Sequence, residues 1–273
     1  RRSDQALMSA VTAPHRLVDQ DACELAPSLL EDGRRCKVTP KLLDALWADV
    51  EAQVAAGNAE VRKVAVDLYQ AARLHYDQWL VRAGPTPFVS FVRLVRPDLL
   101  IGPHHWAMAR AFERMARREL LRVMIFMPPG HSKSLFASIL LPAWLFGLNP
   151  RGRILAASHG SDFAREFGRE VKDLIASDAY RRIFPLTGIS MDVAAADDWL
   201  TTLGGKYQAI GVGTAAAGRR ADMLGVIDDP ISEQDAFSET RRDRVKTWMP
   251  SFRTRLMPST PMAICPVRSP IDW

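Results

Sequence analysis

Residues 123–138 read VMIFMPPGHSKSLFAS, and the prediction of the fold starts from this stretch. An apolar run, Val123–Met127, has the length and composition of a buried strand. A sharp Pro-Pro-Gly turn follows it, and the pair Lys133 and Ser134 then opens a second apolar run of helical character. The order strand, tight turn, helix is typical of α/β folds in which the turn binds an anion.

The turn departs from the usual phosphate loop, G-x-x-x-x-G-K-[ST], because Met127 and Ser132 occupy its two glycine positions. Its backbone is nevertheless suited to phosphate, since the N–H groups of residues 131–134 would open a helix whose dipole attracts anions. The predicted nucleotide-binding residues are Pro129, Gly130, His131, Ser132, Lys133 and Ser134. Lys133 would place its charge on the β- and γ-phosphates, and the Ser134 hydroxyl would bind Mg²⁺. The alternative is a tight turn with an incidental Lys-Ser pair.

Two carboxylates follow another apolar run in ADMLGVIDDPISE, residues 221–233. Phosphoryl chemistry with Mg²⁺ needs one acid that holds the metal and a second that orients and deprotonates water. We assign the metal to Asp228, partly through water, and the base to Asp229, with Glu233 as the alternative base. A solvated Asp-Asp-Pro corner would explain the pair equally simply if it stood alone. Its position after a strand, downstream of the Lys-Ser turn, favours a site.

Strands and helices alternate from residue 121 onward, which predicts an α/β fold with a mainly parallel, helix-covered sheet. The predicted strands are Leu121–Met127, Arg153–Ala157, Met223–Ile227 and Met262–Cys265. Helices are expected from Ser134 and over residues 161–177. Residues 198–213 have the pattern of a hairpin that turns at Gly204 and Gly205.

The first part of the chain has a different pattern. Residues 1–84 are predicted to be a mostly helical subdomain, with one helix that ends at Gly57 and a second that ends at Gly84. Residues 84–106 contain several prolines and are predicted to be irregular, and residues 107–122 are predicted to form a basic amphipathic helix. This pattern places a domain boundary between residues 84 and 85.

Composition sets further bounds. The 48% hydrophobic and 25% charged residues are ordinary for a globular protein, and no apolar run has the length of a membrane span. A net charge of +5, with 29 arginines to 7 lysines, is compatible with a nucleic-acid partner. A GC-rich coding sequence and a solvated surface would explain the same bias. Three cysteines without metal spacing indicate a reducing compartment. The Arg-Arg start suggests a fragment.

A pair of arginines, Arg219 and Arg220, precedes the strand that carries the two carboxylates. A guanidinium that reaches a γ-phosphate stabilises the charge of the transition state, and in ring ATPases it often comes from the neighbouring subunit. We therefore predict a trans-acting arginine finger at one of these two positions. A surface pair or a contact with DNA phosphates is the alternative.

Three stretches in order carry a resemblance to a known family: RVMIFMPPGHSKS (residues 122–134), SDAYRRIFP (177–185) and GTAAAGRRADMLGVIDDPISEQDAFSETRRDRVKTWMPSFRTRL (213–256). Together they resemble the ATPase region of tailed-phage terminase large subunits, over roughly residues 85–273. The resemblance implies a P-loop NTPase domain of the additional-strand, catalytic-carboxylate type at 85–273. It implies an enzyme that uses ATP and Mg²⁺ to drive double-stranded DNA into a procapsid.

The same resemblance implies a role for each motif residue. Lys133 and Ser134 match the Walker A lysine and hydroxyl, Asp228 the Walker B acid, Asp229 the catalytic carboxylate, and Arg219 or Arg220 the finger. The implied partners are double-stranded DNA, the portal protein, the small terminase subunit and further copies of the chain in a homo-oligomeric ring. The implied location is the host cytoplasm, without a membrane. The family's RNase H-like nuclease domain has no counterpart in this chain, so no DNA cleavage is expected from it.

Three departures from the family pattern stand out. Gly130 and Ser132 replace an arginine and a glycine, and Asp229 stands where glutamate is common. Pro266, Val267 and Arg268 replace a Thr-Arg-Trp coupling motif. Two other functions remain open on these grounds. One is another P-loop nucleic-acid translocase or helicase, and the other is a DNA-binding or scaffold module that keeps the fold without hydrolysis.

Overall fold

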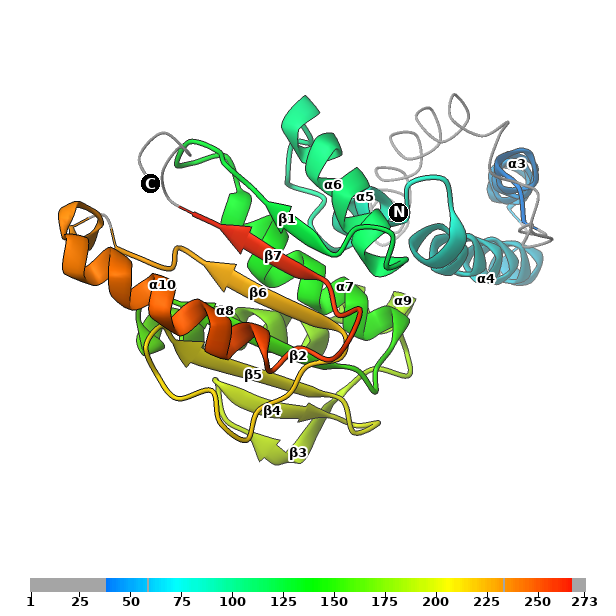
Figure 1. The fold of residues 1–273 in the computed structure, drawn as a ribbon. Helices are drawn as coiled ribbons and strands as arrows, with labels where there is room; N and C mark the ends of the chain where they lie inside the picture. The colour runs from blue at the N-terminus through cyan, green and yellow to red at the C-terminus, as the bar shows by residue number, and fades with distance from the viewer. Residues whose placement is uncertain (1–37, 58, 233, 267–273) are drawn as a thin grey trace. The chain divides into compact units, whose positions relative to one another are not determined.

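The computed structural model describes residues 38–266 except residues 58 and 233, so Glu233, Val267 and Arg268 lie outside the described residues. The chain divides into two compact units, residues 1–100 and residues 101–273, which are described separately (Figure 1). The domain boundary expected between residues 84 and 85 stays a prediction.

The described part of the first unit consists of three helices: α3 (Pro40–Ala56), α4 (Ala59–Ala83) and α5 (Pro87–Val95). The predicted ends of α3 are confirmed. The Thr39 hydroxyl accepts a hydrogen bond from the Leu42 N–H at the start, and Gly57 ends the helix in the left-handed region with φ of 71°. The predicted second helix and its end before Gly84 are confirmed as well. Helices α3 and α4 share an apolar core formed by Leu43, Val50, Ala65, Tyr69, Tyr76 and Leu80.

The prediction of irregular structure at residues 84–106 is wrong at residues 87–95, where α5 forms, and at residues 103–106, which begin the next helix. Pro87 stands in the first turn, where its missing N–H is no loss, and five apolar side chains are buried at Phe88, Val89, Phe91, Val92 and Val95. A proline often breaks a helix, but in this stretch Pro87 and Pro103 each stand at the start of one.

The second unit begins with α6 (Pro103–Ala116) and β1 (Arg122–Met124), which precede a π-helical segment, η1 (Leu135–Leu140), and α7 (Leu141–Leu148). The middle of the unit contains β2 (Arg153–Ser158), α8 (Ser161–Ala176), α9 (Asp178–Ile183), β3 (Ile189–Ala194), β4 (Asp198–Thr201) and β5 (Lys206–Gly211). The last elements are β6 (Leu224–Asp228), η2 (Asp235–Phe237), α10 (Glu239–Arg253) and β7 (Met262–Cys265). The basic helix predicted at residues 107–122 therefore starts and ends earlier, as α6.

The seven strands form one sheet in the order β1-β7-β6-β2-β5-β4-β3. The five strands from β1 to β5 in this order are parallel, while β4 and β3 add to the far edge as antiparallel strands. The predicted mainly parallel sheet and the predicted β4–β5 hairpin are confirmed. Because parallel strands end at the same edge, the residues that follow β1, β2, β6 and β7 lie at one edge of the sheet.

Helices cover both faces of the sheet (Figure 1). Trp248 and Phe252 of α10 pack on one face, against Leu155, Ile210 and Ile227. Segment η1 and helix α8 contact the opposite face. Successive strand residues point to opposite faces, so Ile227 belongs to the α10 side and Asp228 to the η1 side.

Strand β1 differs from the prediction of a buried strand at residues 121–127. It has three residues, and Met124 is 57% exposed. The cause is its position at the edge of the sheet, where only β7 pairs with it. Among the described residues, no helix has both the length and the apolar character that a membrane span requires.

Candidate functional site

The turn after β1 holds two residues in the left-handed region of backbone conformation. Gly130 has φ of 79° and Ser132 has φ of 59°. Glycine adopts this region freely, whereas a residue with a Cβ is strained in it. The helix begins immediately afterwards, at Lys133, and the Ser132 carbonyl accepts a hydrogen bond from the Phe136 N–H. The φ of Ser132 explains why the usual phosphate loop has a glycine at the position that Ser132 occupies in this chain.

The first of the two carboxylates, Asp228, is the last residue of β6 and is buried. Its side chain is 1% exposed, and its Oδ2 accepts a hydrogen bond of 2.8 Å from the Ser138 hydroxyl of η1. Its Oδ1 is buried without a hydrogen-bond partner in the described part of the chain. Burial, and then the nearby charge of Asp229, raise the pKa of Asp228 to about 6, although the Ser138 and Ser134 hydroxyls and the Lys133 ammonium oppose the rise.

The second carboxylate, Asp229, is turned out of the core by an unusual backbone. Its φ of 42° lies in the left-handed region, so its side chain leaves the direction that strand alternation would give it. The Asp229 N–H donates to the Cys265 carbonyl of β7 at 2.8 Å, and the Asp229 carbonyl accepts from the His159 N–H at 3.0 Å. The two adjacent carboxylates therefore occupy different environments, because Asp228 is buried and Asp229 lines the pocket.

Lys133 joins the turn to the second carboxylate. Its ammonium lies 2.9 Å from Asp229 Oδ1 and donates to the Pro266 carbonyl at 2.8 Å, and the side chain is only 10% exposed. These contacts link the segments that follow β1, β6 and β7. The structure therefore brings the predicted lysine and the predicted base together.

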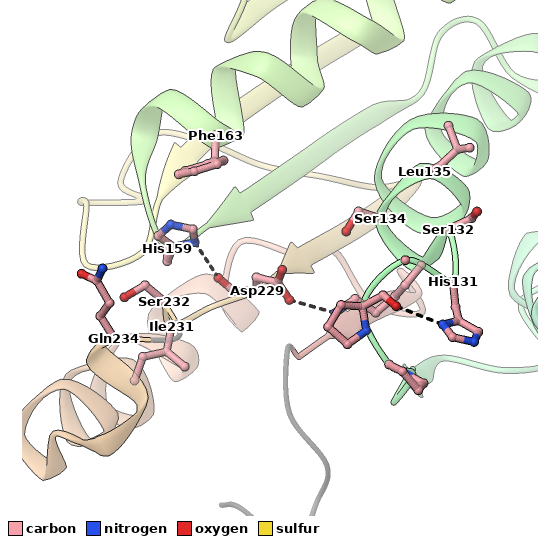
Figure 2. Close-up of a pocket in the computed structure, with 14 residues that line it drawn as sticks. His131, Ser132, Ser134, Leu135, His159, Phe163, Asp229, Ile231, Ser232 and Gln234 are labelled. Carbon is pink, nitrogen blue, oxygen red and sulfur yellow. Dashed lines mark hydrogen bonds and ion pairs between the residues drawn. The ribbon is translucent and has the colours of Figure 1, made fainter.

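A pocket of about 870 Å³ opens at this edge of the sheet. One wall is the turn and helix start, residues 128–135, and Asp229 lies between it and the opposite wall (Figure 2). The opposite wall is formed by His159, Phe163, Ile231, Ser232 and Gln234. All six residues predicted to bind nucleotide line the pocket, whereas the buried Asp228 does not.

Arg219 and Arg220 lie elsewhere in the chain. Neither lines the pocket. Ala221, which follows them, pairs with Leu256. The carboxylate of Asp222 accepts a hydrogen bond from the N–H of Arg153, at the start of β2. The arginine pair is therefore near the beginnings of the strands and not near their ends. The Arg219 guanidinium donates to the Ala215 carbonyl at 2.9 Å, whereas the Arg220 side chain is exposed.

The loop that carries this arginine pair is fixed to α10. The Trp248 indole donates to the Thr214 carbonyl at 2.9 Å, and the Arg244 guanidinium lies so close to Gly213 that a Cβ there would meet its Nε at 2.7 Å. A role of either arginine in phosphate chemistry would therefore concern the pocket of another subunit, and the assignment of a finger stays a prediction.

His159 and Phe163 are pocket residues that sequence reasoning missed. His159 follows β2 at the same edge as Asp228, since Ser158 pairs with Asp228 in register. Its ring lies 4.6 Å from that of Phe163, between centroids (Figure 2). The signal that could have found it was available, because a histidine directly after a predicted parallel strand lies at the ligand-binding edge.

Three more histidines cluster beside the turn. The rings of His105 and Phe136 stack with centroids 4.5 Å apart, and His104 Nε2 lies 3.1 Å from His105 Nε2. The ring centroids of His104 and His131 are 5.5 Å apart. Burial lowers the pKa of His105, and the neighbouring His104 and His131 lower it further. His105 is 5% exposed, so packing explains its position without a ligand.

No protein-family model matches this chain, and no curated protein matches it. Among solved structures, the large terminase of bacteriophage HK97 is similar, with a TM-score of 0.44 and 9% sequence identity. The similar region covers 66% of this chain and 37% of that chain. This chain thus spans well under half of that structure's length, and a similarity of this degree assigns no activity.

Proposed function

We propose that this chain contains a P-loop ATPase that drives double-stranded DNA into a viral procapsid, as the motor part of a terminase large subunit. The observation that carries the enzymatic part is the 2.9 Å contact between Lys133 and Asp229 in a pocket at the carboxyl ends of parallel strands. Residues far apart in the sequence meet there with the charges that phosphoryl transfer requires.

The turn after β1 would bind the phosphates of ATP. The first N–H groups of a helix have no partner within the helix, and here they belong to residues 132–135, which line the pocket. Together with the helix dipole they favour an anion. Lys133 adds a full positive charge at the same place. The turn therefore has what a phosphate group needs, although it lacks the usual glycines.

Asp228 and Ser134 fit a magnesium ion. Both offer oxygen ligands, and Asp228 Oδ1 is buried and unpartnered among the described residues. The Ser134 hydroxyl is close enough to lower the pKa of Asp228. Mg²⁺ prefers oxygen, keeps several waters, and needs only one or two protein ligands beside the substrate phosphates. When bound, Mg²⁺ supplies positive charge that offsets the charge of the phosphates.

Asp229 would act as the general base. In the structure its carboxylate is paired with Lys133. Phosphate oxygens compete with Asp229 and with the Pro266 carbonyl for the three N–H bonds of the ammonium. Once Lys133 turns to phosphate, the Asp229 carboxylate is released to orient a water molecule and to accept its proton.

The motor role and its partners rest on the family resemblance of residues 85–273. Under this proposal the chain contacts DNA mainly through phosphates, and its copies form a ring that works with the portal protein and the small terminase subunit. Arg220 is better placed than Arg219 to reach a neighbouring subunit, because the Arg219 guanidinium is bonded to the carbonyl of Ala215 within its own loop.

Phosphate release from ATP, measured with and without duplex DNA, tests the proposal. Asp229→Asn should lower turnover by roughly 10²–10⁴-fold, the usual loss when a general base is removed. It should leave binding of a fluorescent ATP analogue nearly unchanged. Lys133→Ala should abolish turnover and should also weaken binding, because its charge acts on phosphate before and during the reaction.

Lys206→Ala is the matched control, since Lys206 forms another Lys–Asp pair in the same sheet, 3.1 Å from Asp198 and away from the pocket. It should keep wild-type turnover. Wild-type turnover by either Lys133→Ala or Asp229→Asn would refute the assignment of the site. Nucleotide binding without turnover in the wild type would favour a scaffold that has kept the fold.

A further inference from the structure

The backbone of Asp229 combines two unfavourable features. Its φ of 42° is in the left-handed region, and the next residue is Pro230, whose ring restricts the backbone of the residue before it. Such a conformation persists only where neighbouring groups hold it. Any relaxation of this backbone would also move the Asp229 carboxylate, because the side chain is attached to the same Cα.

Three hydrogen bonds hold the backbone of Asp229, and two of them come from one residue. The Asp229 N–H donates to the Cys265 carbonyl at 2.8 Å. The Asp229 carbonyl accepts from the His159 N–H at 3.0 Å and also lies 3.2 Å from His159 Nδ1. Figure 2 shows this imidazole beside Asp229, on the side away from the phosphate-binding turn.

The chemistry of the third contact identifies its donor. A carbonyl oxygen can only accept, so His159 Nδ1 must carry the hydrogen. The ring of Phe163 packs against the imidazole with centroids 4.6 Å apart, which restricts the rotation of the ring. The side chain of His159 is thus a fixed donor, aimed at the peptide that carries the candidate base.

We propose that His159 is a positioning residue for ATP hydrolysis. Its Nδ1–H holds the Asp229–Pro230 peptide, so that the Asp229 carboxylate stays directed at the phosphate-binding turn. This inference rests on the proposed ATPase function. It assigns to His159, a residue of the pocket wall, a role that is exerted through Asp229.

Replacement of His159 by three side chains separates positioning from packing. His159→Asn places an amide N–H close to the position of Nδ1, whereas His159→Gln places it about one bond further out, and His159→Leu has no donor. We expect kcat to fall roughly 10-fold in the Gln and Leu variants, the order expected for one hydrogen bond. The Asn variant should stay within about 3-fold of wild type, and KM for ATP should change by less than about 2-fold in all three.

Controls distinguish this inference from the proposed function. His75→Asn, at an exposed position of α4, should have wild-type kcat. If wild type hydrolyses ATP and the Gln and Leu variants match it, the role of His159 is refuted while the proposed function stands. If the Asn variant is as slow as the Gln variant, or if KM rises at constant kcat, positioning through Nδ1 is refuted. If wild type does not hydrolyse ATP, the proposed function fails first.

Folding of the variants can be judged independently. Urea unfolding should show that the Asn and Gln variants are both folded, with the Gln variant less stable by about 1 kcal/mol because it lacks the hydrogen bond to the Asp229 carbonyl. A kcat difference between two folded variants of similar polarity then reports the position of the amide donor. This pair keeps the inference testable even if the Leu variant fails to fold.

Discussion

Without Mg²⁺, the free energy of unfolding of the Asp228→Asn variant, relative to that of wild type, should increase as the pH rises. The ordinary pKa of this carboxyl is 3.8, and burial beside Asp229 raises it to about 6 in the folded chain. Between these values the folded chain keeps a proton that the unfolded chain has released. The free energy of unfolding of wild type therefore falls with rising pH in this window, whereas the contribution of an asparagine at this position is independent of pH.

The magnitude follows from the two pKa values. At about 1.4 kcal/mol for each pH unit, the difference between 3.8 and about 6 amounts to about 3 kcal/mol once the pH is above 6. About 2 kcal/mol of this falls between pH 4.5 and pH 7.5, because the unfolded carboxyl is already largely ionised at the lower pH. Packing differences between Asp and Asn cancel, since they do not depend on pH.

Urea unfolding in EDTA, at several pH values from 4.5 to 7.5, measures this quantity for wild type and variant. The stability of Asp228→Asn relative to wild type should increase by about 2 kcal/mol over that range. Ser138→Ala provides a second check. It removes a hydrogen bond that lowers the pKa of Asp228, so the loss of stability should extend to higher pH.

A difference between variant and wild type that does not change with pH would refute the reasoning. It would mean that ionised Asp228 carries no burial cost in the folded chain. Saturating Mg²⁺ with a nonhydrolysable nucleotide should reverse the order at pH 7.5, because at the proposed metal site only wild type has a carboxylate at residue 228. A residue that destabilises the empty protein and stabilises the loaded one is expected at a functional site.

Two further predictions concern assembly and packing. If Arg219 or Arg220 acts on a neighbouring subunit, specific ATPase activity should rise with protein concentration. Arg220→Ala should flatten this rise more than Arg219→Ala. A rate per chain that is independent of concentration would exclude a trans-acting finger. Gly168→Ala should lower the free energy of unfolding by about 1–3 kcal/mol, because the added Cβ would lie 2.2 Å from the Ala196 carbonyl oxygen. Gly160→Ala, whose Cβ would make an ordinary 3.5 Å contact with Phe163, is the control in urea unfolding and should lose less than about 1 kcal/mol.

Predictions from the sequence succeeded where short-range chemistry decides structure. Thr39 and Gly57 mark the ends of α3 because a hydroxyl cap and a left-handed glycine act within one helical turn. The β4–β5 hairpin turns at Gly204, whose φ of 86° suits a glycine. The prediction at α5 failed because a proline can start a helix as well as end one, and only the burial of the following apolar residues decides between the two.

The sequence by itself predicted every strand after residue 121 that the structure describes except β3, and it placed a lysine-serine turn and a pair of carboxylates at the ends of two strands. It could not determine which side chains meet. The sheet order places β7 between β1 and β6, so that the Pro266 carbonyl reaches Lys133, and β2 beside β6, so that His159 reaches Asp229. These contacts depend on strand pairing between distant segments, which short-range sequence patterns do not encode.

The different environments of Asp228 and Asp229 were also decided by tertiary structure. Strand alternation alone would direct the two side chains to opposite faces of the sheet. Instead, the backbone of Asp229 leaves the strand conformation with φ of 42°, held by Cys265 and His159, and its carboxylate meets Lys133 at the pocket. Asp228 keeps the strand direction and is buried against η1. Adjacent residues of identical chemistry thus acquire different proposed roles, because burial and backbone conformation depend on neighbours far away in the sequence.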